Sequence, residues 1–88
     1  MDERLYAVGH ALASRERLAV LCVLAEGNAS AGELVARTGE PDVLDHLEVL
    51  GAAGLVRAGI EGCFGLASLD VLVLVTALET IARGRDAG

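Results

Sequence analysis

The feature that most constrains the fold is a nearly uninterrupted apolar segment at residues 69–83, which reads LDVLVLVTALETIAR. Valines alternate with leucines in its first half, so an extended strand competes with a helix as its interpretation. Its length favours a helix, as do Ser68 as an N-cap and Asp70 in the first turn, and Arg83-Gly84 is the expected end. A helix that is apolar on nearly all sides must be buried on nearly all sides. At the edge of a small domain only a second subunit can provide that cover, so the segment predicts a dimer.

Length and composition are typical of a small, folded, soluble protein. The 88 residues suffice for one domain, residues 1–88, and the 53% of apolar residue types excludes a disordered chain. The longest apolar run, residues 71–78, is far shorter than the roughly 20 residues that a membrane span needs. The first residues contain acids and lack the long apolar core of a signal peptide. We therefore expect a cytoplasmic protein that has no membrane partner.

Helix start and stop signals divide the rest of the chain. Ser14 is a suitable N-cap for the apolar stretch that follows it, and Gly27 marks the end of that stretch. Ser30 and Glu33 have the spacing of a capping box. Pro41 suits the first turn of the next helix, where its missing N–H costs nothing. We expect helices at about residues 2–13, 15–26, 31–38 and 41–52, a β-hairpin at about 55–67, and the last helix at about 69–83.

Two segments resemble the ArsR/SmtB family of repressors. The run ALASRERLAVLCVLAEG is similar to that family's second-helix signature, ALADPTRLRILRLLAEG, and GELVARTGEPDVLDHLEVLGAAGLV is similar to GELAEALGLSQSTVSHHLKVLREAGLV. The shared positions are Leu12, Arg17, Leu18, Leu21, Leu24, Gly27, Gly32, Glu33, Leu34, Val43, His46, Leu47, Val49, Leu50, Ala53, Gly54, Leu55 and Val56. The resemblance implies a winged helix-turn-helix, a mostly α fold with a small β-hairpin, and a role in transcription regulation.

Members of the family are dimers held by their first and last helices. The resemblance therefore places a homodimer interface on the first and last predicted helices of this chain. The candidate interface residues are Leu5, Val8, Leu12, Leu72, Val75 and Leu78. In the alternative interpretation, the same side chains complete the core of a monomer.

The helix that reads DNA in this family carries acids in this chain. In the family its exposed positions hold polar residues such as Gln, Ser, Thr, His and Lys. Here four carboxylates stand within residues 40–48, and no arginine or lysine accompanies them. The candidate surface comprises Glu40, Asp42, Leu44, Asp45, His46 and Glu48. Because binding to duplex DNA relies on cations that displace condensed counterions, these acids should repel the phosphates.

The predicted wing is similarly short of cations. Family wings carry a basic tip, as in RSRREGRWVYYRL, whereas RAGIEGCFGL is shorter and keeps only Arg57. We therefore expect a regulator that acts through protein contact, either by capping a basic DNA-binding protein or by forming a heterodimer that cannot bind an operator. An ordinary solvated helix face is the competing interpretation of the acids. A DNA-binding repressor is the alternative function, with Arg15, Arg17, Arg37 and Arg57 as candidate phosphate contacts.

Neither a catalytic set nor a metal site is visible in the sequence. There is no Gly-rich phosphate loop and no nucleophile with a positioned base, so we expect neither an enzyme nor a cofactor. The family's metal-binding positions lack their cysteines and histidines here, where the third-helix region reads NASAGEL. Cys22 and Cys63 form no CxxC pair, and we expect small buried apolar residues in a reducing compartment. A thiol or redox sensor that uses these two cysteines is the remaining alternative.

Overall fold

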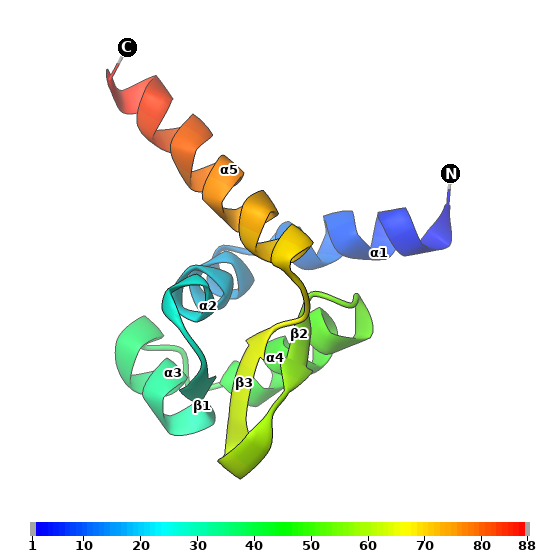
Figure 1. Ribbon diagram of the computed structural model, residues 1–88, viewed down its shortest axis with the longest axis vertical. Helices are drawn as coiled ribbons and strands as arrows, with labels where there is room; N and C mark the ends of the chain where they lie inside the picture. Colours follow the sequence, from blue (N-terminus) through cyan, green and yellow to red (C-terminus); the bar gives the residue numbers. More distant parts are fainter. Residues whose placement is uncertain (1, 88) are drawn as a thin grey trace.

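The computed structural model describes residues 2–87 and contains five α-helices with a small antiparallel sheet (Figure 1). In chain order the elements are α1 (Glu3–Leu12), α2 (Arg15–Glu26), β1 (Ala29–Ser30), α3 (Ala31–Thr38), α4 (Val43–Ala52), β2 (Val56–Ala58), a 3-10 turn (Ile60–Gly62), β3 (Cys63–Leu66) and α5 (Leu69–Ala87). This order confirms the predicted winged helix-turn-helix, with α3 and α4 as its helix-turn-helix pair and β2–β3 as its wing.

Side-chain caps fix where the first three helices begin. The carboxylate of Asp2 accepts a hydrogen bond from the backbone N–H of Arg4 at 2.8 Å, and the Ser14 hydroxyl accepts one from the N–H of Arg17 at 3.3 Å. At the start of α3 the predicted capping box is present in both directions. Ser30 Oγ accepts from the Glu33 N–H at 3.1 Å, and the Glu33 carboxylate accepts from the Ser30 N–H at 3.0 Å. These contacts satisfy backbone donors that have no partner inside a helix.

Two helix boundaries differ from the prediction. The helix expected to start at Pro41 starts at Val43, because Pro41 and Asp42 form a turn and Asp42 is the N-cap residue. The last helix does not end at Gly84 but continues to Ala87. A glycine inside a helix costs only about 1 kcal/mol relative to alanine, so it weakens a helix without ending it.

The sheet contains one strand that the sequence did not predict. The strands lie in the order β1-β3-β2 and are antiparallel, with Ala29 opposite Phe64 and Val56 opposite Leu66. The new strand, β1, has only two residues, which is too short to show an alternating pattern. A β-carbon at Gly65 on the central strand would collide with the side-chain amide of Asn28, so a larger residue there would require that side chain to move.

The core forms around α2, which packs against α1, α3, α4, α5 and β3. The buried apolar residues are Ala11, Val20, Leu21, Val23, Leu24, Ala29, Leu34, Val43, Leu47, Leu50, Leu55, Val56, Val71 and Val75. Each large aliphatic side chain buried in this way contributes about 1.5–3 kcal/mol of transfer free energy. The helices that carry them fix α4 and the wing side by side on one side of the domain (Figure 1).

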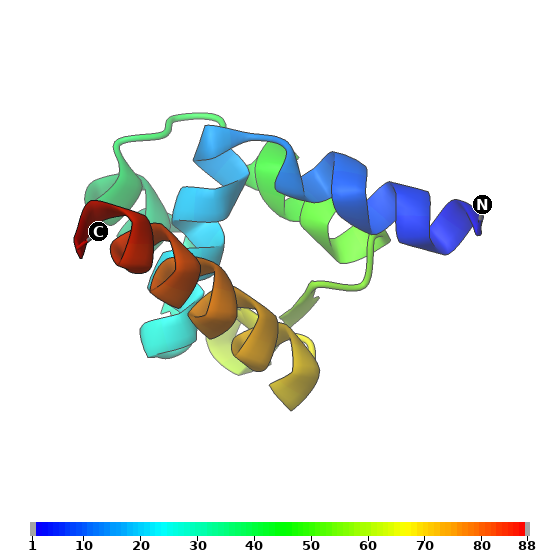
Figure 2. The same ribbon diagram turned by 90° about the horizontal axis from the view of Figure 1, so that it is seen from above.

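Both terminal helices project from the body of the domain (Figures 1 and 2). Only the start of α5 packs on the core, through Val71 and Val75, and no residue from Thr76 to Gly84 is buried. The outer faces of α1 and α5 expose Leu5, Tyr6, Val73 and Ile81, among others. No helix among residues 2–87 is long and apolar enough to cross a membrane.

Candidate partner-binding surface

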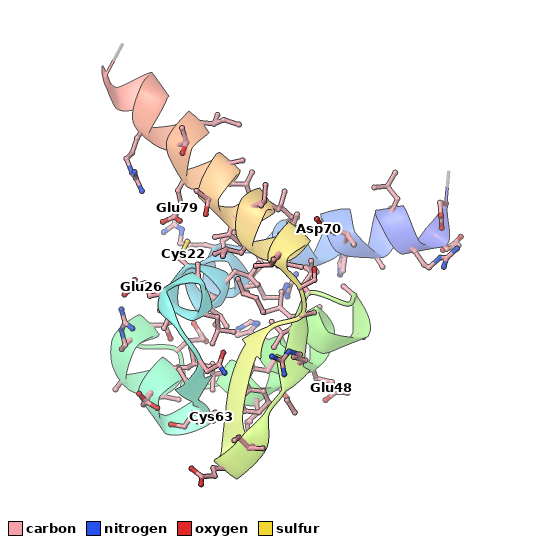
Figure 3. The ribbon with its side chains drawn as sticks, viewed as in Figure 1. Cys22, Glu26, Glu48, Cys63, Asp70 and Glu79 are labelled. Atoms are coloured by element: carbon pink, nitrogen blue, oxygen red, sulfur yellow. The ribbon has the colours of Figure 1, made fainter. Side chains whose placement is uncertain are left out.

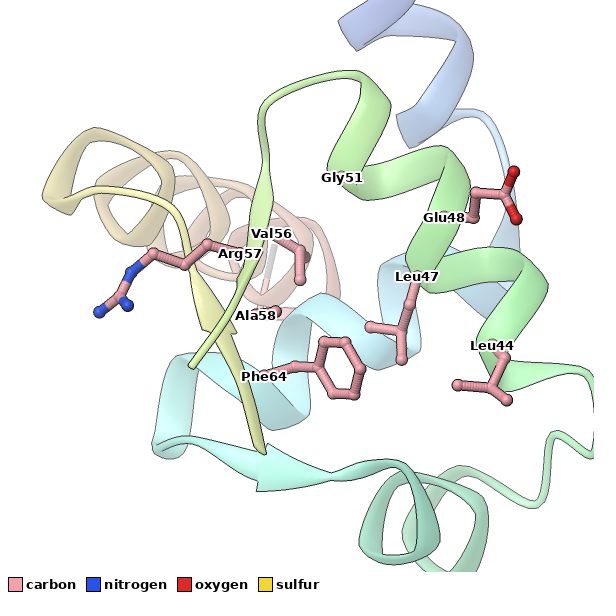
Figure 4. Close-up of a pocket in the computed structure, with 8 residues that line it drawn as sticks. All are labelled: Leu44, Leu47, Glu48, Gly51, Val56, Arg57, Ala58 and Phe64. Carbon is pink, nitrogen blue, oxygen red and sulfur yellow. The ribbon is translucent and has the colours of Figure 1, made fainter. Parts of the chain in front are cut away.

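An apolar groove separates α4 from the wing. Its volume is about 310 Å³, it is open to solvent, and its lining residues are Leu44, Leu47, Glu48, Gly51, Val56, Arg57, Ala58 and Phe64. The side chains of Leu44, Leu47 and Phe64 point into it, whereas those of Glu48 and Arg57 point away from it on opposite sides (Figure 4). We call this feature, together with the exposed acids of α4, the α4–wing surface. It occupies the position that the sequence assigned to partner docking.

The six residues predicted for this surface divide into two groups. Asp42, Leu44, Asp45 and Glu48 are exposed, and Leu44 retains 63% of its accessible area. Glu40 and His46 are instead partly buried, and Glu40 Oε1 lies 3.7 Å from His46 Nε2. These two side chains contact each other, so they contribute less than the other four to the outward face.

Asp45 and Glu48 form no ion pair with any described residue. They lie three residues apart on α4, so they are neighbours on one helix face. A pair of unneutralised carboxylates beside an apolar groove gives the surface a negative potential at its rim.

The tip of the wing adds an apolar residue and another acid. Ile60 is 85% exposed, and Glu61 follows it with a left-handed backbone, at φ 57° and ψ 34°. The tip therefore turns within the predicted hairpin and has an exposed isoleucine where the family resemblance would place a cation. Sequence reasoning missed both Ile60 and Phe64, because neither carries a charge or a motif.

The four candidate phosphate-binding arginines are in different environments. Arg17 donates from Nε to the Ala11 carbonyl oxygen at 2.7 Å and from Nη2 to the His10 carbonyl oxygen at 3.1 Å, which closes the end of α1. Arg37 donates to Glu26 at 2.8 Å. Arg15 and Arg57 are exposed, and Arg57 lines the groove together with Glu48. Two of the four cations are therefore engaged with groups of the chain itself, and the other two are exposed.

The six candidate dimer residues are also in different environments. Leu5 and Leu78 are exposed, while Val8, Leu12 and Leu72 are partly buried against the chain itself. Val75 is only 2% exposed and belongs to the chain's own core, so it offers almost no surface to a partner copy. It faces inward because it lies one helical turn after the buried Val71. The exposed apolar residues Tyr6, Val73 and Ile81 occupy the outer faces instead.

The two cysteines are free and lie on different elements, Cys22 on α2 and Cys63 on β3 (Figure 3). Cys22 lies beside Glu79 of α5 and near Glu26 (Figure 3). Partial burial, and then the negative charges of Glu79 and Glu26, raise the pKa of the Cys22 thiol above its usual range. A thiol that stays protonated is a poor nucleophile, so this environment disfavours the redox-sensor alternative for Cys22.

No group of three or more His, Cys, Asp or Glu side chains suited to a metal ion occurs within the described part of the chain. The isolated carboxylates of α4 and α5 therefore remain surface charges. The exposed acids, the groove and the wing form one continuous candidate surface. It contains no positioned nucleophile and base among the residues described.

The arrangement of α3, α4 and wing defines a winged helix-turn-helix protein. The sequence model of the bacterial regulatory protein ArsR family matches residues 14–58, and the chain belongs to this family. Family and fold thus point to a transcriptional regulator rather than an enzyme. A search of curated protein sequences finds no significant match.

Solved structures resemble the chain over most of its length. The homodimeric winged helix-turn-helix DNA-binding domain of Mb0332 from Mycobacterium bovis is 30% identical, with a TM-score of 0.87 over 94% of this chain and 82% of that one. HlyU from Vibrio cholerae is 27% identical, with a TM-score of 0.81 over 92% of this chain and 97% of that one. The transcriptional repressor BigR from Xylella fastidiosa is 33% identical, with a TM-score of 0.73 over 88% and 84% of the two chains.

Proposed function

We propose that this ArsR-family regulator is a homodimer whose α4–wing surface binds a basic protein rather than operator DNA. The observation that carries the proposal is the pair Asp45 and Glu48, exposed on α4 with no cation partner among the described residues. In a regulator of this fold, such a partner is a basic DNA-binding protein, which the acidic surface would keep from its DNA.

Electrostatics supports a protein partner over DNA. Duplex DNA carries one phosphate charge about every 1.7 Å of its axis, and proteins bind it by neutralising several of them. One like-charge pair at 4 Å costs about 1 kcal/mol even in water. With Asp42, Asp45 and Glu48 facing the phosphates and Arg57 as the cation on the same surface, the repulsive contacts outnumber the attractive ones.

The terminal helices support the dimer. Leu5, Tyr6, Val73 and Ile81 expose apolar surface on two helices that project from the body. A hollow of about 500 Å³ lies along α1, lined by Leu5, Tyr6, Gly9, His10 and Ala13. The M. bovis domain, which is 30% identical, is homodimeric. A second copy that covers these faces would remove them from water.

The DNA-binding repressor remains the second candidate function, because the similar M. bovis domain is a DNA-binding domain and because Arg15 and Arg57 are exposed. Fluorescence anisotropy with the duplex upstream of the chain's own coding sequence separates the two candidates. The protein-contact proposal predicts only weak binding that does not depend on sequence. Sequence-specific binding in the nanomolar range that weakens steeply with salt would overturn it and establish the repressor.

A further inference from the structure

We infer that the groove between α4 and the wing receives apolar side chains from a basic amphipathic helix of the partner protein. This rests on the proposed protein-docking function and adds the chemistry of the docking segment. That segment would present two leucine-like side chains one helical turn apart, with lysines or arginines beside them.

The groove has the shape and lining for apolar anchors. Leu47 and Val56 are buried at its base, and Leu44 and Phe64 point into it from opposite walls (Figure 4). Six of the eight lining residues have no polar side-chain atom. Filling a water-exposed groove of this kind with an aliphatic side chain is therefore favourable, because apolar surface on both sides leaves the water. Helix-in-groove recognition uses anchors of this sort at i and i+4.

The charges beside the groove specify the basic character of the occupant. Glu48 lies at the α4 side, and its helix neighbour Asp45, three residues earlier, lies outside the groove lining. Arg57 lies at the opposite side, on β2. A docked helix therefore needs its cations along the edge that faces α4 and a neutral or acidic residue near Arg57. This asymmetry gives the docked helix an orientation as well as affinity.

Other occupants fit the surface less well. A phosphate-bearing ligand would meet Glu48, while six of the lining residues offer no side-chain hydrogen-bond donor. A second copy of the chain would bring acids to acids, because its net charge is -6. Its exposed apolar helices also begin with acids in the first turn, Glu3 on α1 and Asp70 on α5. A basic helix is the occupant that satisfies both the apolar groove and its acidic side.

Three synthetic helical peptides of equal length test the inference when titrated against the full chain by fluorescence anisotropy. The first carries lysines and two leucines spaced i and i+4, the second has alanines in place of the leucines, and the third keeps the leucines but has glutamates in place of the lysines. We expect the first to bind about tenfold more tightly than the second, and the third not to bind. Equal binding of the first two would overturn the groove inference while leaving charge-driven docking intact. Failure of both basic peptides to bind would overturn the proposed protein docking as well.

Leu44→Glu distinguishes apolar anchoring from charge. The substitution adds a carboxylate to the surface, so charge alone would tighten binding of the leucine-containing basic peptide. Loss of an apolar wall predicts weaker binding instead, by about fivefold to tenfold. Because Leu44 is exposed, the variant should keep the fold, which circular dichroism checks. The matched control is Leu69→Glu, an exposed leucine on α5 that is 78% accessible and outside the groove. Unchanged or tighter binding by Leu44→Glu would overturn the inference.

Discussion

Arg17 donates from its Nε to the backbone carbonyl oxygen of Ala11 at 2.7 Å, across the junction between α1 and α2. A second bond, from Nη2 to the His10 carbonyl oxygen, places the guanidinium at the C-terminal end of α1. A cation is favourable there, because the free carbonyl groups at a helix end carry partial negative charge. This arginine, which matches the ArsR signature, therefore holds two helices together instead of standing free for a phosphate.

Arg17→Ala should lower the free energy of unfolding by about 1–2 kcal/mol, because two carbonyl groups lose a charged donor. Urea unfolding followed by circular dichroism measures the change. Arg15→Ala is the matched control, since Arg15 is exposed two residues earlier, and its effect should stay within about 0.5 kcal/mol. Equal effects of the two substitutions would contradict the structural role of Arg17.

The capping box predicts a specific pH dependence of stability. The hydrogen bonds that join Glu33 to Ser30, backbone and side chain, lower the pKa of the Glu33 carboxyl below its usual range. A folded-state pKa that is lowered adds stability above the ordinary glutamate pKa of about 4.3, and this stability is lost as the pH falls through the lowered value. Glu33→Gln keeps a side-chain acceptor but cannot titrate. It should therefore flatten the decrease in urea midpoint below about pH 4.3, and an unchanged acid profile would refute this assignment.

The outer face of α5 predicts where the dimer can be disrupted. Ile81, which is 64% exposed, belongs to the apolar surface proposed for the partner copy. Ile81→Glu should place a charge in that interface and weaken dimerisation by about tenfold or more, as measured by analytical ultracentrifugation. Ile60→Glu, the same substitution at the wing tip, should leave dimerisation unchanged. A monomeric wild-type chain, or equal weakening by both variants, would contradict the proposed interface.

The environment of Cys22 predicts slow thiol chemistry. Burial raises the pKa of the thiol, and the Glu79 and Glu26 charges raise it further, so little thiolate is present near neutral pH. In a Cys63→Ser background, reaction with a maleimide should titrate above the ordinary cysteine pKa of about 8.5. Adding Glu79→Gln should lower that titration point and accelerate the reaction. Fast reaction at neutral pH, or sulfenic acid formation with dilute peroxide, would instead favour the redox-sensor alternative.

Local signals in the sequence located most of the helices, and the family resemblance supplied the fold. Ser14, Ser30 and Glu33 are caps that depend only on neighbouring residues, and they form as predicted. The strand β1 was missed because its two residues pair with β3 across more than thirty positions of the chain. The boundary at Pro41 was wrong because proline also suits a turn that precedes a helix.

At the candidate sites, tertiary packing determines which side chains are buried and which segments meet, and the sequence alone does not show this. Val75 and Ile81 lie on one apolar helix, and only the position of α5 on the core separates the buried residue from the exposed one. The acids of α4 were visible in the sequence, but the groove was not, because Leu44 and Phe64 come from distant segments. The structural role of Arg17 could also be assigned only once the position of the Ala11 carbonyl group was known.

The central claim is that exposed acids on α4 select a basic protein over DNA. It is tested most directly by the double variant Asp45→Asn/Glu48→Gln, with Glu3→Gln/Asp70→Asn as a control that has the same change in charge on first turns of other helices. The measurement is the dissociation constant for the leucine-containing basic peptide, beside that for the upstream duplex. The account predicts that the α4 variant binds the peptide about fivefold to tenfold more weakly, whereas the control variant binds it with wild-type affinity. It also predicts that wild type binds duplexes of different sequence with equal, weak affinity. Unchanged peptide affinity in the α4 variant, or nanomolar sequence-specific binding of the duplex by wild type, would contradict it.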